Sequence, residues 1–138
     1  MGNHWLELGT EISKLIGEHD ALSLKKPHTV ISNCSLDSIK TDLDLMKLID
    51  QDDGMAADDF VLMMQKYLHF ATKLHSPHFM AHQVAPPHPA SAWADAVHGF
   101  TNNGHATSEM GPQAIAVEVT VVQWMLKQLG WTSGGGQL

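Results

Sequence analysis

The spacing of apolar residues in the first half of the chain predicts three amphipathic helices. In residues 3–19 apolar side chains recur at three- and four-residue steps, and Asn3 is the expected N-cap. A second periodic segment follows Ser35, which can cap it, and continues to about Met46. The third segment, residues 56–74, carries its large apolar side chains on a single stripe. This half of the chain is therefore expected to be helical.

Prolines interrupt the periodic pattern after the third segment, and two further helices are expected beyond them. Four prolines between residues 76 and 89 exclude a continuous helix and favour an extended path. A short helix is predicted for residues 90–100. The last helix begins at Pro112 and ends at Gly130, a left-handed cap, with Trp131 packing back on its final turn. Because apolar residues occupy almost its whole circumference, we expect this helix to be covered on nearly every side.

Composition limits the classes of protein that the chain can represent. Its 138 residues, 43% of them hydrophobic, have the usual size of one domain. The 15 acidic and 8 basic residues give a formal charge of −7, and the basic residues are scattered lysines, so nucleic-acid binding is not expected. The single cysteine, Cys34, cannot form an internal disulfide, and the first residues lack a secretion signal, which favours the cytoplasm. No apolar run approaches the roughly 20 residues that cross a bilayer, so no membrane contact is expected.

A glycine-rich segment, residues 132–136, follows the last helix. Glycines let backbone N–H groups converge on an anion, so this loop predicts a phosphate site. A flexible tail is the alternative interpretation of the same glycines. The helix that would add its positive N-terminal end does not follow in this chain, and we therefore expect an N-terminal piece of a larger enzyme.

The most specific signal is an ordered set of short motifs with tight spacing. They are Ser76-Pro77-His78-Phe79-Met80, Thr101-Asn102-Asn103, Thr107-Ser108-Glu109-Met110-Gly111-Pro112, the helical run 117–125, Leu129-Gly130-Trp131 and Thr132-Ser133-Gly134-Gly135-Gly136. Together they resemble the start of the group II pyridoxal-phosphate-dependent amino-acid decarboxylases, the family of glutamate, aromatic amino-acid, cysteine-sulfinate and diaminobutyrate decarboxylases. The resemblance covers about Leu74 to Leu138.

The resemblance implies a mainly α segment that forms the N-terminal helical part and the first large-domain helix of an α/β fold-type-I enzyme. Residues 1–75 would be a helical dimerisation segment, and residues 76–138 the start of the cofactor-binding region, truncated at the phosphate loop. The expected partners are an L-amino-acid substrate, a second copy in a homodimer and the remainder of the same enzyme.

The same resemblance implies which residues form the site. Those expected at the phosphate of pyridoxal 5′-phosphate are Ser133, Gly136, Gln137 and Leu138. Those expected on the substrate side are His78, Phe79 and His82, together with Asn102, His105 and Thr107, whose turn would reach the neighbouring subunit's site. No catalytic residue is expected in this segment, because the family's cofactor-binding lysine, ring-stacking histidine and ring-nitrogen aspartate follow the phosphate loop.

The implied activity is removal of the α-carboxylate of an L-amino acid, with the pyridine ring of the cofactor as the electron sink. The spacing around residues 107–112 is closest to the acidic-substrate branch, but diaminobutyrate and aromatic substrates stay open. The chain contains no arginine, so an anionic substrate side chain would be held elsewhere in the enzyme.

Two other interpretations compete with the decarboxylase. His75, His78, His82 and His88 are spaced closely enough to surround a divalent metal, but the neighbouring prolines oppose the necessary geometry and no metal site is predicted. The chain would otherwise be a helical dimerisation or adaptor module. That interpretation explains the apolar last helix and leaves the glycine loop without a role.

Overall fold

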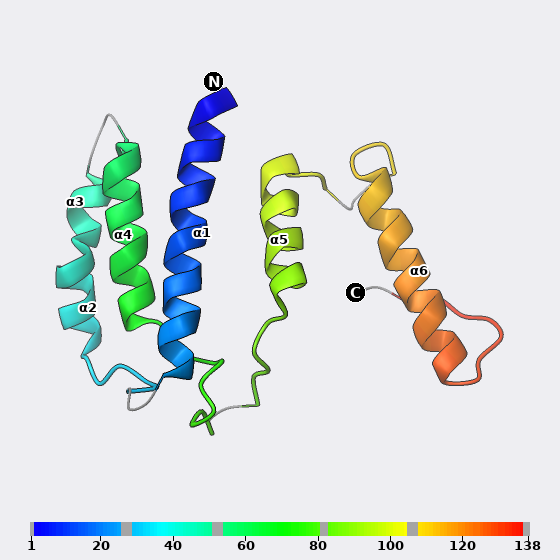
Figure 1. Cartoon of the computed structure of the whole chain (residues 1–138). Helices are drawn as coiled ribbons and strands as arrows, with labels where there is room; N and C mark the ends of the chain where they lie inside the picture. Colours follow the sequence, from blue (N-terminus) through cyan, green and yellow to red (C-terminus); the bar gives the residue numbers. More distant parts are fainter. Residues whose placement is uncertain (1, 26–28, 51–53, 81–82, 105–107, 137–138) are drawn as a thin grey trace. The chain divides into compact units, whose positions relative to one another are not determined.

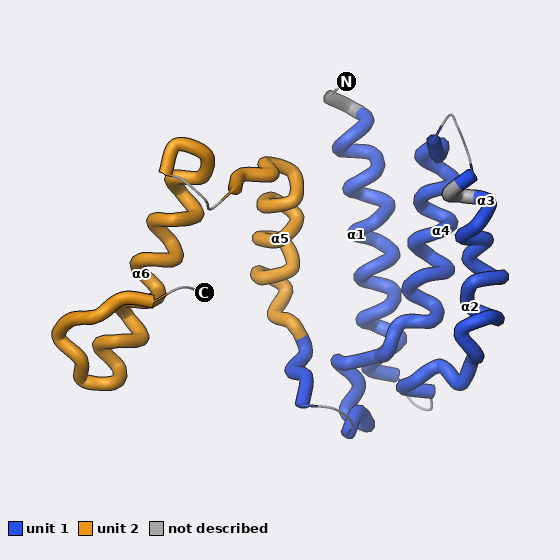
Figure 2. Tube along the Cα trace, turned by 180° about the vertical axis from the view of Figure 1, so that it is seen from behind, with its two compact units in different colours: residues 1–86 blue, residues 87–138 orange. Residues whose placement is uncertain are grey.

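The computed structural model describes residues 2–25, 29–50, 54–80, 83–104 and 108–136. Within these ranges the chain forms six α-helices and no strand, so the predicted mainly α fold is confirmed (Figure 1). The chain divides into two compact units, residues 1–86 and residues 87–138 (Figure 2).

Unit 1, residues 1–86, is a small helical bundle. It contains α1 (Gly2–Leu24), α2 (Leu36–Leu43), α3 (Leu45–Ile49) and α4 (Ala57–Phe70). Figures 1 and 2 show α1 beside α4, running in the same direction, and α2 packed on α4. The hydrophobic core of this bundle is small, because Leu43 is the only apolar side chain that is buried among the described residues.

Helix α1 is longer than its sequence pattern predicted. It begins at Gly2, so the assignment of Asn3 as N-cap is wrong, and it continues past His19 to Leu24. In the added turn Ser23 is 1% exposed, and its hydroxyl donates to the His19 carbonyl oxygen at 2.8 Å. A serine that bonds to the preceding turn can stay inside a helix, and this contact allows the extension.

The second predicted segment is two helices. Ser35 is confirmed as the N-cap of α2, since its hydroxyl oxygen accepts the Ser38 N–H at 3.1 Å. The expected continuous helix to Met46 is wrong, because Asp44 has a left-handed backbone with φ of 51° and separates α2 from α3. Aspartate tolerates this conformation better than most residues do.

Replacing Ser35 with alanine should lower the free energy of unfolding of unit 1 by about 1 kcal/mol, because the cap of α2 loses its acceptor. Urea unfolding followed by circular dichroism measures the change. Ser38→Ala is the matched control, since it removes a hydroxyl inside the same helix and keeps the capped N–H. Equal losses in the two variants would contradict the assignment of the cap.

Helix α4 has the predicted start, with Asp58 and Asp59 in its first turn, but it ends at Phe70 and not at Leu74. The chain turns after Phe70 because Ala71 takes an extended conformation, and the Lys73 N–H then bonds to the Val30 carbonyl oxygen at 3.0 Å. A contact with a distant segment therefore replaces the last helical turn.

Unit 2, residues 87–138, contains α5 (Pro89–Thr101) and α6 (Pro112–Gln128), close to their predicted bounds. His88 caps α5, with Nδ1 accepting the Ala90 N–H at 3.2 Å. Gly130, with φ of 74°, follows α6, and its N–H bonds to the Lys127 oxygen while the Trp131 N–H bonds to the Leu126 oxygen. These two bonds are the Schellman pattern, which confirms the predicted glycine cap.

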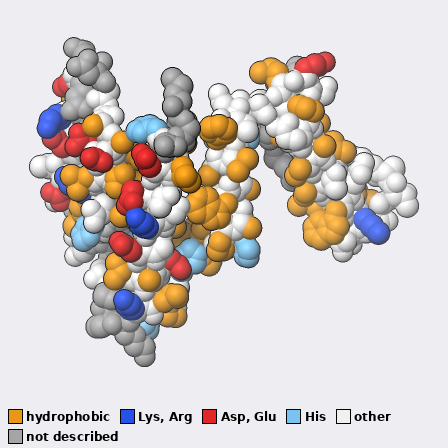
Figure 3. Space-filling view, turned by 45° about the horizontal axis from the view of Figure 1, so that its top comes forward, with side chains coloured by type: hydrophobic (Ala, Val, Ile, Leu, Met, Phe, Trp, Pro, Cys, Tyr) orange, Lys and Arg blue, Asp and Glu red, His pale blue; other side chains and the backbone are white. Residues whose placement is uncertain are grey.

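The apolar side chains of unit 2 remain largely exposed. The described parts of α5 and α6 do not pack on each other, and Figure 3 shows hydrophobic side chains at the surface of α6. All four tryptophans of the chain, three of which belong to unit 2, are 53–65% exposed. A stable folded domain normally buries such side chains, so unit 2 presents surface suited to covering by other polypeptide.

Candidate functional site

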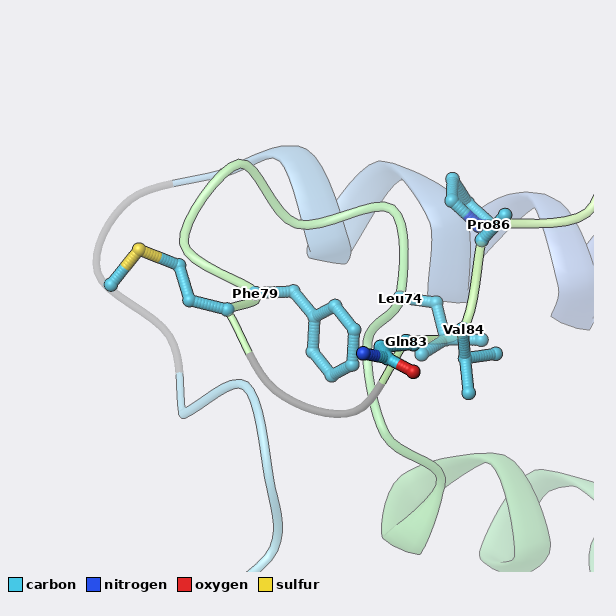
Figure 4. A pocket seen from close by; sticks show the side chains of 7 residues that line it. Leu74, Phe79, Gln83, Val84 and Pro86 are labelled. Carbon is cyan, nitrogen blue, oxygen red and sulfur yellow. The ribbon is translucent and has the colours of Figure 1, made fainter.

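An open hollow of about 580 Å³ lies in unit 1, where the chain leaves α4. It is lined by Leu74, Phe79, Met80, Gln83, Val84, Ala85 and Pro86. Figure 4 shows the Phe79 ring pointing towards the Gln83 amide, with Leu74 and Val84 beyond it. The hollow is mostly apolar, and Gln83 supplies one polar group with donors and an acceptor.

Ser76 sets the direction of the chain at this hollow. Its side chain is nearly buried, its hydroxyl oxygen accepts the His78 N–H at 3.3 Å, and its carbonyl oxygen accepts the Phe79 N–H at 3.0 Å. These bonds form a tight turn around Pro77 that aims Phe79 into the hollow and leaves His78 exposed. Two of the predicted substrate-side residues therefore belong to one structured turn.

The turn after α5 brings two glycines together. Asn102 ends α5 with a left-handed backbone, φ of 46°, and its N–H bonds to the His98 oxygen at 2.8 Å. A Cβ placed on Gly111 would lie 2.5 Å from the Gly104 carbonyl oxygen, a separation that no side chain allows. Glycine at position 111 therefore lets the chain close on itself immediately before α6 begins.

The glycine-rich segment folds back along α6. A Cβ on Gly134 would lie 3.2 Å from Leu126, and one on Gly136 would lie 3.5 Å from Val122, so the two glycines pass close to the helix. Within the described residues, the N–H groups of residues 134–136 donate to no protein acceptor. They are available to an anion, as a phosphate loop requires.

Five of the predicted site residues, His82, His105, Thr107, Gln137 and Leu138, lie outside the described residues. Of the remaining five, His78 and Phe79 share one turn in unit 1. In unit 2, Asn102 lies in the turn after α5, and Ser133 and Gly136 lie in the glycine-rich segment after α6; their assignment to substrate and cofactor stays a prediction.

Sequence reasoning missed Gln83, which faces Phe79 across the hollow. The four residues that follow it are two small apolar residues and two prolines, and no periodic pattern marks which side chains of an extended segment point inward.

Two of the histidines considered as metal ligands have other contacts in the structure. His75 Nδ1 lies 3.5 Å from the Asp20 carboxylate, and His88 caps α5. The described part of the chain holds no group of three or more His, Cys, Asp or Glu residues arranged for a metal ion. Nor does any helix there combine the length and apolar character needed to cross a bilayer.

The chain is similar to L-2,4-diaminobutyrate decarboxylase of Acinetobacter baumannii, with 28% identity over 72 residues. The aligned region covers 52% of this chain and 14% of that protein, so the chain spans a small part of its relative's length. No family model matches the chain. No solved structure matches it either. The similarity indicates a relationship to the decarboxylases.

Proposed function

We propose that this chain is the N-terminal part of a pyridoxal-phosphate-dependent L-amino-acid decarboxylase. The observation that carries the proposal is the similarity to a diaminobutyrate decarboxylase, which agrees with the ordered motifs from Ser76 to Gly136. L-2,4-Diaminobutyrate is the first substrate to test, because the relative's name specifies it.

The backbone N–H groups of the glycine loop would bind part of the cofactor phosphate. The N–H groups of residues 134–136 have no acceptor among the described residues, and the loop passes close to α6, where a Cβ on Gly134 would lie 3.2 Å from Leu126. Ser133 and Gly136, with Gln137 and Leu138 beyond the described residues, would bind the phosphate oxygens. Pyridoxal phosphate, when bound, supplies a ring that accepts the electrons left by the departing carboxylate.

The residues at the hollow in unit 1 would form one wall of the substrate pocket. Phe79 offers an apolar surface to the substrate's methylene groups and excludes water from that side. The Gln83 amide can donate to or accept from a polar substrate group. His78, exposed at the same turn, would contact the substrate once the rest of the pocket is present.

The exposed apolar residues of the helices would form the dimer contacts. Trp5 and Leu6 are exposed at the start of α1, and Val117 and Trp124 are exposed on α6. Surfaces of this kind are typical of subunit interfaces, and a second copy of the chain with the remainder of the enzyme would cover them.

The test is to produce the protein from its complete gene, add pyridoxal phosphate and measure carbon dioxide release from L-2,4-diaminobutyrate, L-glutamate and an aromatic L-amino acid. We expect a visible absorbance band from the bound cofactor and cofactor-dependent release from one of these substrates. Residues 1–138 alone should show neither signal. A complete protein that binds no cofactor and only self-associates would support the helical adaptor instead.

A further inference from the structure

Titratable side chains gather where the C-terminal half of α1 meets the end of α4. His19 of α1 is half-buried and donates a hydrogen bond to the Leu68 backbone carbonyl of α4. Lys73 and His75 act on His19 from the segment after α4, and Asp20 acts on it from α1. We call these four residues, His19, Asp20, Lys73 and His75, the His19 cluster.

The same residues join the segment after α4 to the end of α1. His75 Nδ1 lies 3.5 Å from Asp20 Oδ1. The Lys73 ammonium donates to the Thr29 carbonyl oxygen at 3.0 Å, while its backbone N–H bonds to Val30. Through these contacts the position of α1 is coupled to the start of the segment that carries Ser76 and Phe79.

Other polar groups line the hollow of about 190 Å³ beside His19. Glu18 lies on α1, and Gln65 and His69 lie on α4. His19 therefore faces one lysine and two histidines, with Glu18 and Asp20 as the acidic residues on its own helix.

We propose that the His19 cluster is an acid-sensitive contact between α1 and the segment after α4. The bond from His19 to Leu68 holds in both protonation states, but protonated His19 is disfavoured by its partial burial and is repelled by Lys73 and by His75. Acid would then weaken the α1–α4 pair. The inference concerns the helix pair itself and holds whatever reaction the complete protein performs.

The direction of the pH effect follows from the environment of His19. Burial lowers the pKa of His19 below its ordinary value of 6.5, and the charge of Lys73 lowers it further. The hydrogen bond to Leu68 and the charge of Asp20 act in the opposite direction but do not reverse the shift. Because the unfolded chain binds the proton more readily, stability is complete above pH 6.5 and is lost as pH falls towards the lower folded pKa.

The contact between His75 and Asp20 opposes the loss of stability at low pH. Its contact with Asp20 becomes an ion pair only when the imidazole is protonated. Both side chains are partly exposed, so the pair adds little free energy and should not cancel the effect of His19.

NMR titration of the His19 ring in residues 1–138 tests the contact directly. We expect a pKa below 6.5 in the wild-type chain and a higher pKa in Lys73→Gln, because the nearby positive charge is removed. A wild-type value at or above 6.5, or no increase in Lys73→Gln, would overturn the proposal.

Urea unfolding at about pH 7.5 and about pH 5.5 tests the consequence. The equilibrium constant for unfolding should rise severalfold at the lower pH, and at most about tenfold from one histidine. His19→Gln should remove this rise. His4→Gln, which changes an exposed histidine of the same helix, should keep it. If His19→Gln retains the whole dependence on pH, His19 is not the sensor.

Discussion

Replacing Gly134 with alanine should weaken cofactor binding by roughly fivefold to 150-fold, which corresponds to about 1–3 kcal/mol of backbone strain. Gly134 has φ of 149°, a conformation that side chains disfavour, and an added Cβ would lie 3.2 Å from Leu126. Alanine would therefore move the loop away from α6 and displace the N–H groups proposed to bind the phosphate. The measurement is titration of the cofactor-free protein, expressed from its complete gene, with pyridoxal phosphate.

Gly135→Ala is the matched control for this variant. A Cβ on Gly135 would meet no atom within 4 Å, its φ is not positive, and alanine keeps the backbone N–H. The control should bind the cofactor within about twofold of the wild type, as expected for a surface substitution of this size. Similar losses in both variants, or none in Gly134→Ala, would show that the observed loop conformation does not serve the cofactor.

Replacing Trp124 with glutamate should raise the dissociation constant for self-association of residues 1–138 by about thirtyfold or more. Trp124 is 59% exposed on α6, and a tryptophan at the centre of an interface typically contributes 2 kcal/mol or more. Sedimentation at several protein concentrations measures the change, and circular dichroism checks that the helices are retained.

Gln123→Glu separates loss of the apolar contact from the added charge. It places the same carboxylate at the preceding, exposed position of α6. This variant should alter the dissociation constant by no more than about two- to threefold. If Trp124→Glu associates like the wild type, the exposed face of α6 is not the surface at which copies meet, and the proposed dimer contact there is wrong.

Local signals were sufficient for the helices of unit 2. Pro112 and Gly130 mark the ends of α6 because a proline suits the first helical turn and a glycine suits the left-handed cap. Helix α6 carries apolar side chains around most of its circumference, and they are exposed because no other described helix packs on it.

Local signals were not sufficient in unit 1. Residues 36–46 read as one periodic segment, yet the left-handed backbone of Asp44 breaks it, and α2 packs on α4 whereas α3 does not. Helix α4 ends before its apolar stripe does, since the Lys73 backbone bonds to Val30 instead of continuing the helix. The early end of α4 therefore accompanies a contact between segments that are distant in the sequence.

The candidate site shows the same division. The sequence predicted an extended path after Ser76 and a loop at Gly134, and the structure adds the serine bonds that turn the chain and aim Phe79, and the close approach of Gly134 to Leu126. Gln83 could not be identified beforehand, because an extended segment has no periodicity that predicts which side chains face a hollow.

The sequence by itself determined the helical character of the chain, the Ser35 and Gly130 caps and the glycine loop, because each depends on residues within a few positions of one another. Only the tertiary structure decided that α1 lies along α4 and that His19 meets Lys73 and His75. The burial and the charges that lower the pKa of His19 come from segments far along the chain, so no local pattern could reveal them.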